Sequence, residues 1–192
     1  MEQRFYNAAR DGNPSLLSSL LLEPGPPFNI NYRNEGMFGR SALHAACYNG
    51  HHDVVLFLLK LPEIQVNLRN DLGYTPFLLA CYSGMVEVVK LLLRDTRTEV
   101  NTADNSERTP LWRAADRGHV EVIRWMVALR GTELEVDMRG EGWRGNKVTV
   151  LEIAKEQGKL PVMELLQRFV ANPAKVQHEL KVELGLVDAI AA

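Results

Sequence analysis

Of the 192 residues, 24% are charged and the formal net charge is −2; because there is no overall basic field, we expect no nucleic-acid partner. No apolar run approaches the roughly 20 residues that span a bilayer, and the first residues do not resemble a signal peptide, so we expect no membrane contact and a cytoplasmic or nuclear location. The two cysteines, Cys47 and Cys81, lie 34 residues apart and are expected to be buried thiols rather than a disulfide.

The first 31 residues read as two short helices around Gly12. The second has an apolar face that we expect to contain Leu16, Leu17, Leu20 and Leu21, with serines toward solvent. One polar face is what the end of a stacked array needs. The proline-rich run at 23–28 then predicts a stiff turn, because proline cannot continue a helix.

Residues 73–101 contain the clearest structural unit. Thr75 can cap a helix that begins at Pro76, and Gly84 can end that helix in a left-handed conformation. The next helix is apolar around most of its circumference, which does not suit a helix exposed on one side. Both helices are also shorter than the roughly 12 to 15 residues at which an isolated helix becomes stable. This unit therefore needs neighbours.

The same unit recurs along the chain. Its capping residues follow one another at intervals of 34, 34 and 40 residues: Ser41, Thr75, Thr109 and Thr149. A period in this range marks a stacked repeat array. The segments 41–46 (Ser-Ala-Leu-His-Ala-Ala), 75–80 (Thr-Pro-Phe-Leu-Leu-Ala) and 109–114 (Thr-Pro-Leu-Trp-Arg-Ala) resemble the Thr-Pro-Leu-His-x-Ala motif of ankyrin repeats.

The resemblance predicts an all-α ankyrin-repeat solenoid, built from helix-turn-helix-hairpin repeats of about 34 residues. We expect one continuous domain at 1–171, with repeats at about 1–31, 32–67, 68–101, 102–137 and 138–171, and a C-terminal helix at 172–192. That last helix has an apolar stripe that includes Val176, Leu180, Leu184 and Val187. It either caps the open face of repeat five or docks on a partner, and we expect the cap.

Two positions depart from the family pattern. His44 stands where the family has a histidine that bonds the capping hydroxyl, whereas Leu78 and Trp112 at the equivalent sites are not expected to reproduce that network in full. The hairpin connection before repeat five, at 139–147, is longer than its counterparts and contains Trp143. This tryptophan is either an anchor for a partner or a plug folded over the inserted residues, and we expect the plug.

No catalytic, cofactor or metal motif is recognisable, so we expect no enzymatic activity and no cofactor. The resemblance instead implies a monomeric protein-protein interaction module or scaffold that binds another protein through its concave face. The implied contact residues are Arg40, Tyr48, Asn49, Tyr74, Tyr82, Ser83, Arg108, Trp112, Asp116, Arg117, Trp143 and Arg144. The alternatives are a targeting or autoinhibitory ankyrin module of a larger multidomain protein and, more remotely, an unrecognised enzyme.

Asn67 and Asn101 resemble asparagines that are hydroxylated in some ankyrin proteins, because each lies eight residues after a leucine and directly follows a valine. The alternative is a structural role, in which the asparagine side chain bonds backbone groups of the connection. We expect the structural role.

Overall fold

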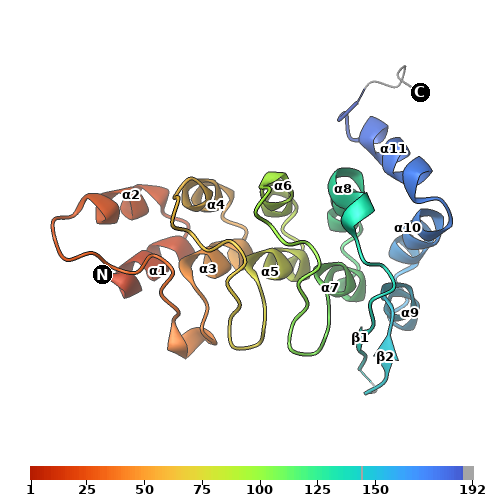
Figure 1. The fold of residues 1–192 in the computed structure, drawn as a ribbon, viewed down its shortest axis with the longest axis horizontal. Coiled ribbons are helices and arrows are strands. Elements are labelled where there is room, and N and C mark those ends of the chain that lie inside the picture. Colours follow the sequence, from red (N-terminus) through yellow and green to blue (C-terminus); the bar gives the residue numbers. More distant parts are fainter. Residues whose placement is uncertain (144, 188–192) are drawn as a thin grey trace.

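The computed structural model describes residues 1–143 and 145–187 as a row of antiparallel helix pairs (Figure 1). The pairs are α1 (Glu2–Arg10) with α2 (Pro14–Leu22), α3 (Ala42–Asn49) with α4 (His52–Leu59), α5 (Pro76–Ser83) with α6 (Val86–Arg94), α7 (Pro110–Arg117) with α8 (Val120–Arg130), and α9 (Val150–Glu156) with α10 (Leu160–Ala171). The last helix is α11 (Pro173–Glu183), and two short 3-10 helices are η1 (Glu35–Met37) and η2 (Gly131–Glu133).

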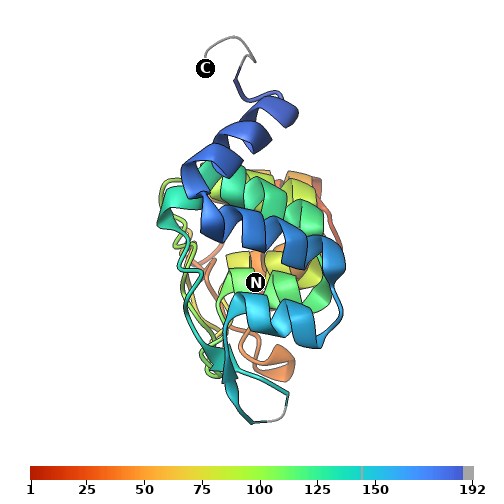
Figure 2. The same cartoon turned by 90° about the vertical axis from the view of Figure 1, so that its right-hand side faces the viewer.

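The helices form two layers, with α1, α3, α5, α7 and α9 in the inner layer and α2, α4, α6 and α8 in the outer one. The connections between successive pairs, which we call fingers, project together from one side of the inner layer (Figure 2). The finger before α9 contains a small antiparallel sheet of β1 (Gly140–Glu141) and β2 (Lys147–Val148). The predicted all-α solenoid is therefore confirmed.

Local sequence chemistry sets the ends of the inner helices. The Thr75 hydroxyl accepts a hydrogen bond from the amide of Leu78 at 3.1 Å, and Thr109 does the same for Trp112. Gly84 ends α5 at φ +72°, and a side chain there would come within 2.7 Å of the His119 ring. Only glycine meets both demands, because it tolerates positive φ and leaves room for the next repeat.

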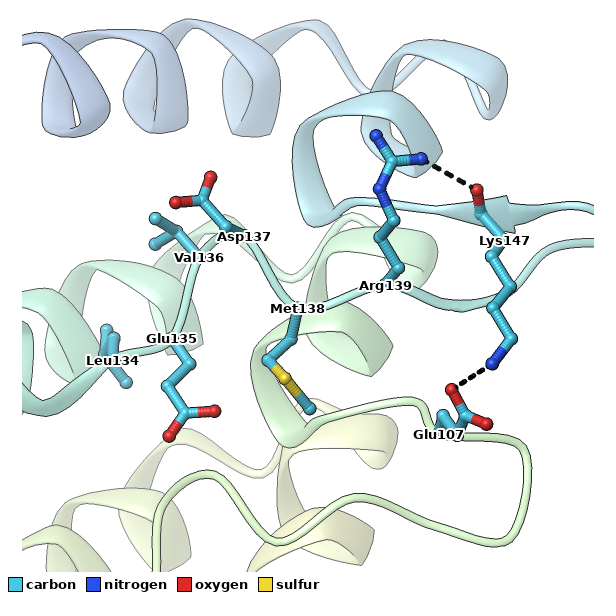
Figure 3. Close-up of a pocket in the computed structure, with 8 residues that line it drawn as sticks. All are labelled: Glu107, Leu134, Glu135, Val136, Asp137, Met138, Arg139 and Lys147. Atoms are coloured by element: carbon cyan, nitrogen blue, oxygen red, sulfur yellow. Dashed lines mark hydrogen bonds and ion pairs between the residues drawn. The ribbon is translucent and has the colours of Figure 1, made fainter.

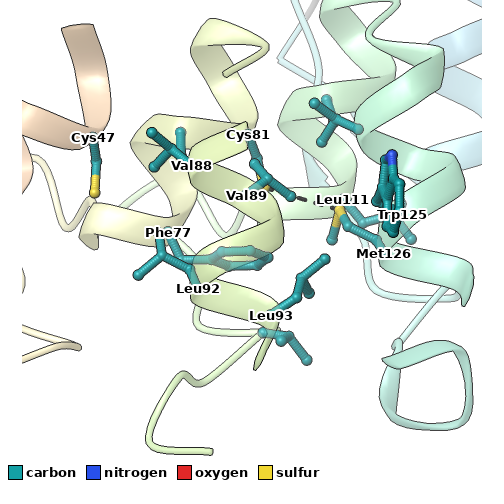
Figure 4. Close-up of a cluster of buried hydrophobic side chains, with 14 of the residues drawn as sticks. Cys47, Phe77, Cys81, Val88, Val89, Leu92, Leu93, Leu111, Trp125 and Met126 are labelled. Carbon is teal, nitrogen blue, oxygen red and sulfur yellow. Dashed lines mark hydrogen bonds between the residues drawn. The ribbon is translucent and has the colours of Figure 1, made fainter. Parts of the chain in front are cut away.

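The core runs continuously through all the repeats, as stacked repeats require. Ala46, Ala80 and Ala114 are fully buried where the inner helices approach one another. Both cysteines are buried and free, as expected, and the thiol of Cys81 lies 3.9 Å from the Met126 sulfur (Figure 4). Burial raises the pKa of that thiol well above its usual value, so it remains protonated.

The apolar face predicted for the second helix was wrong in part. Leu17 and Leu20 are buried, but Leu16 and Leu21 remain 36% and 37% exposed. The physical reason is that α2 is the first outer helix, and its main contacts are with α1 and α4. A helix with so few neighbours buries a narrow stripe and leaves its flanking leucines in contact with water.

The C-terminal helix begins as predicted, with the Asn172 side chain accepting from the amide of Lys175. Its position differs from the expected cap over repeat five, because α11 packs against α8 and η2 of repeat four as well as against α10 (Figure 1). Val176 and Leu180 are buried there, whereas Val187 is exposed. The helix therefore fills the outer layer between two repeats; residues 188–192 lie outside the described part.

Candidate protein-binding surface

A groove runs across the C-terminal ends of the inner helices, whereas the fingers lead into their N-terminal ends. Its volume is about 600 Å³, and it is lined by residues from the last turns of α3, α5 and α7 and from the turns that follow them: Tyr48, Asn49, Tyr82, Ser83, Met85, Arg117 and His119. We call it the tyrosine groove. Tyr48 and Tyr82 stand two residues before the glycines that end their helices, so the repeat places them at the same height in neighbouring units.

Tyr74 and Tyr82 are held by a buried ion pair. Their rings stack with centroids 6.3 Å apart, and the guanidinium of Arg113 lies 5.1 Å from the Tyr74 centroid. Arg113 donates to the Tyr74 hydroxyl at 2.8 Å and, through Nε, to Asp104 at 2.8 Å. The other carboxylate oxygen of Asp104 accepts from two backbone amides of its finger, including that of Arg108. The pair thus ties α7 to the finger before it and to the tyrosines of repeat three.

The sequence analysis missed Arg113 and Asp104 as members of this surface. Arg113 occupies the variable position of the motif, so a charged residue stands where repeats two and three have the buried apolar residues Ala45 and Leu79. A buried charge needs a partner, because leaving it unpaired in the interior costs several kcal/mol. That mismatch was the signal that could have revealed the pair, although its partner could not be named without the finger geometry.

Three further arginines lie over aromatic rings of this surface, two of them over tyrosines and one over tryptophans. Arg40 lies 4.4 Å from the Tyr48 centroid, and Arg117 lies 4.3 Å from the Tyr82 centroid. Arg117 also donates to the Tyr82 hydroxyl. Such contacts orient a guanidinium and hold it in place without neutralising its charge.

Arg108 is sandwiched between two tryptophans. Its guanidinium is 4.9 Å from the Trp112 ring and 5.3 Å from the Trp143 ring, and its Nε donates to the carbonyl of Glu141 at 2.6 Å. Arg108 therefore links the finger before α7 to the one before α9.

Trp112 and Asp116 were predicted as contact residues, and their burial corrects that expectation. Trp112 is only 1% exposed, because it packs beneath the finger and donates its indole N–H to the carbonyl of Val148 at 3.2 Å. Asp116 is 6% exposed, and its carboxylate accepts from the indole N–H of Trp143 at 2.9 Å. Both residues support the surface from within.

Trp143 combines the two alternatives considered for it. Its indole N–H is tied to Asp116, as expected for a plug, yet the ring remains 60% exposed and offers area to a partner. Of the other predicted residues, Tyr48, Asn49 and Arg117 are exposed, and Arg40, Tyr74, Tyr82, Ser83 and Arg108 are half-buried. Arg144 lies outside the described residues.

The two asparagines considered for hydroxylation form structural links. Asn67 donates to the carbonyl of Arg97 at 2.7 Å and accepts from the amide of Glu99 at 3.1 Å. Asn101 makes the equivalent pair of bonds to the carbonyl of Glu133 and the amide of Glu135. Each side chain therefore joins its own connection to that of the next repeat, rather than bonding only its local turn.

A second hollow, of about 670 Å³, lies between the finger before α7 and the segment that follows η2 (Figure 3). Its apolar lining comes from Leu134, Val136 and Met138, and an ion pair between Glu107 and Lys147 crosses its edge. It shares no residue with the predicted contact surface, so the two hollows are separate candidate sites.

Within residues 1–143 and 145–187, no group of three His, Cys, Asp or Glu side chains is placed to hold a metal ion. In the same ranges, no helix is long and apolar enough to span a bilayer. His44 is buried, and burial lowers the pKa of its imidazole to about 4, so it is neutral in its bonds to Ser41 and to the carbonyl of Tyr74.

Helix pairs in register, capping hydroxyls and turn glycines define a class of stacked-repeat proteins that typically act as interaction modules rather than as catalysts. A family model for three ankyrin repeats matches residues 5–104, and a model for a single ankyrin repeat matches residues 106–139. The chain belongs to the ankyrin repeat family.

Two curated relatives share a short segment with this chain. Over 47 residues it is 38% identical to SMC5-SMC6 complex localization factor protein 1 of Bos taurus and 36% identical to the same-named protein of Homo sapiens. The match covers 24% of this chain and only 4% of each relative. The similarity is therefore confined to a small part of those proteins.

Proposed function

We propose that this protein is an interaction module or scaffold that binds another protein through its concave face, the side formed by the fingers and by the last turns of α3, α5 and α7. The observation that carries this proposal is the tyrosine groove, in which Tyr48 and Tyr82 line one hollow and each ring has an arginine against it. Tyrosine and arginine are enriched at interface hot spots, because each combines large contact area with a polar end.

The proposal includes a monomer without catalytic activity, located in the cytoplasm or nucleus. A second candidate is a targeting or autoinhibitory module within a larger protein. The curated relatives support it, because the segment that this chain resembles is a small fraction of each and their name describes a localization factor. An adaptor that brings a partner to a place would use the same concave face.

The test compares two variants in affinity capture from a lysate followed by mass spectrometry. The double variant Tyr48→Ala and Tyr82→Ala removes the two tyrosine rings that line the groove. The control is Lys60→Ala, because Lys60 is exposed at the end of α4, in the outer layer. Truncating a buried hot-spot residue costs about 2 kcal/mol, which is more than about tenfold in affinity. If both folded variants retain the partner equally, the groove is not the binding site. Loss of the partner on Met138→Asp would then place the site in the second hollow.

A further inference from the structure

Building on the concave-face function proposed above, we propose that the bound segment is an acidic, extended peptide whose carboxylates pair with Arg40, Arg108 and Arg117. The binding mode is a row of carboxylate-guanidinium pairs along the tyrosine groove and the fingers beside it. The recognition chemistry is that of Asp and Glu side chains.

The ion pairs of the described arginines show which guanidiniums are available to a partner. Nine of the arginines that the structure describes lie within ion-pair distance of a carboxylate: Arg4, Arg10, Arg33, Arg97, Arg113, Arg124, Arg130, Arg139 and Arg168. The remaining described arginines have no such partner among the described residues: Arg40, Arg69, Arg94, Arg108 and Arg117. Two of these five, Arg40 and Arg117, lie over the tyrosines that line the groove, and Arg108 lies over the tryptophans of the neighbouring fingers.

The same three guanidiniums are positioned for binding. Each lies over an aromatic ring, which restrains its orientation before any ligand arrives. Among the described residues, the guanidinium of Arg108 donates only through Nε to the carbonyl of Glu141, and that of Arg117 donates only to the Tyr82 hydroxyl. The Nε of Arg40 is buried, so its terminal nitrogens are the ones that can reach a ligand. A guanidinium has five N–H donors in a planar fork that matches a carboxylate. The remaining donors of all three arginines can therefore receive one.

None of the three arginines lies within ion-pair distance of a carboxylate among the described residues. Asp104 is engaged by Arg113, and Asp116 accepts from Trp143 and is buried beneath it. Local positive potential in a concave surface steers an acidic segment toward it and disfavours a basic one.

The spacing of the arginines fits a short extended chain. Arg40 precedes α3 and Arg117 ends α7, so the three residues span neighbouring units of the array. With inner helices about 10 Å apart, two repeats correspond to roughly 20 Å, or about six residues of extended peptide. A nucleic acid is a less suitable occupant, because three separated cations on a protein of net charge −2 give little compensation for a polyanion.

The experiment measures fluorescence anisotropy of the full chain with three labelled probes of about six units, the length set by the span of the face. The probes are oligoglutamate, oligolysine and oligothymidylate. We expect the oligoglutamate alone to bind, with an affinity that falls as salt is raised. Arg40→Glu combined with Arg117→Glu should weaken it by about tenfold or more. The control, Lys60→Glu combined with Arg94→Glu, makes the same charge change at two exposed basic residues at the ends of the outer helices α4 and α6 and should change it by less than about twofold.

Equal weakening by both double variants, or no binding of oligoglutamate, overturns the proposal. Oligothymidylate bound as tightly as oligoglutamate also overturns it, in favour of a nucleic-acid site. If the double variant does not fold, Arg117→Glu alone tests the proposal, because Arg117 is exposed. If the captured partner is lost on the Tyr48 and Tyr82 variant but kept by the arginine variants, the concave-face function stands and the acidic peptide fails.

Discussion

Trp112 donates its indole N–H to the backbone carbonyl of Val148 at 3.2 Å. In repeat two, the imidazole Nε2 of His44 makes the equivalent contact with the carbonyl of Tyr74 at 2.9 Å. Both carbonyls belong to the residue just before the next capping hydroxyl, so two different side chains link successive repeats at the same point. We expected that Trp112 would not reproduce the histidine network in full. The bond between repeats is present, but the bond from the side chain to the capping hydroxyl is lost.

Trp112→Phe should therefore destabilise the protein. The substitution keeps an aromatic ring but removes the donor to Val148, and we expect a loss of about 1 to 2 kcal/mol in the free energy of unfolding. Trp125→Phe is the matched control, because the indole N–H of Trp125 reaches the exposed carboxylate of Glu121, which water can solvate instead. Urea denaturation measures both variants. Equal losses would show that the cross-repeat bond contributes nothing beyond ring volume.

Burial of His44 makes stability depend on pH. Its imidazole has a pKa of about 4 in the folded protein, against about 6.5 in an unfolded chain. The unfolded state binds a proton between these values and the folded state does not. Neutral His44 therefore contributes about 3 kcal/mol to the free energy of unfolding. This contribution is fully present above about pH 6.5 and is lost as the pH falls toward about 4.

His44→Leu tests this dependence, because leucine is the natural residue at the same position of repeat three. The variant should be less stable at neutral pH, since it lacks the bonds to Ser41 and to the Tyr74 carbonyl. Its stability should also fall less steeply than that of the wild type from pH 6.5 to 4, as measured by urea midpoints at several pH values. Parallel curves would mean that His44 remains protonatable in the folded state.

The repeat architecture was predictable because it depends on local chemistry. Thr75 and Thr109 cap helices through bonds three residues away, and Gly84 ends one by its own backbone freedom, so short sequence windows contain the cause of each feature. Interactions between distant segments were not predictable in this way. Arg113 meets Asp104 across a finger, and α11 reaches back to α8, and neither contact leaves a periodic pattern in the sequence.

The candidate surface shows the same division. The register of Tyr48 and Tyr82 followed from the repeat, and the structure places both in one hollow. Burial of Trp112 and Asp116 could not be foreseen, because it depends on how the irregular finger before α9 folds over α7. That finger is longer than the others, so the repeat gives no template for its path.

Ala80→Leu should overpack the interface between inner helices. Ala80 is completely buried in α5, which packs against both α3 and α7, and added methylenes in such a site cost about 1 to 3 kcal/mol. Ala171→Leu, at the exposed end of α10, is the control and should change the urea midpoint little. An unchanged midpoint for Ala80→Leu would show that the inner helices are not closely packed there.

Removing residues 173–192 should lower the melting temperature and promote self-association. Val176 and Leu180 are buried against the outer layer, so their loss exposes apolar surface on α8 and α10 and costs about 3 kcal/mol or more. Arg124→Ala combined with Arg168→Ala removes the ion pairs that these arginines make with Glu183 and Glu179 of α11, together with the pair of Arg124 with Glu121, and should cost about 1 kcal/mol or less. A truncated chain that melts unchanged and stays monomeric, by calorimetry and light scattering, would favour a helix that docks on a partner.

Trp143→Phe should loosen the finger before α9 without destabilising the repeats. Its indole N–H bonds the buried carboxylate of Asp116 at 2.9 Å, whereas β1 and β2 are only two residues long each, and so short a hairpin has little stability of its own. Hydrogen exchange should accelerate at the backbone amides of residues 141–147 and stay unchanged in α7, with less than about 1 kcal/mol lost globally. Trp125→Phe, the same substitution on α8, should leave the finger's exchange as in the wild type. Unchanged exchange after Trp143→Phe would mean that the base of the finger, where the amide of Glu141 bonds the carbonyl of Ser106, suffices to hold it.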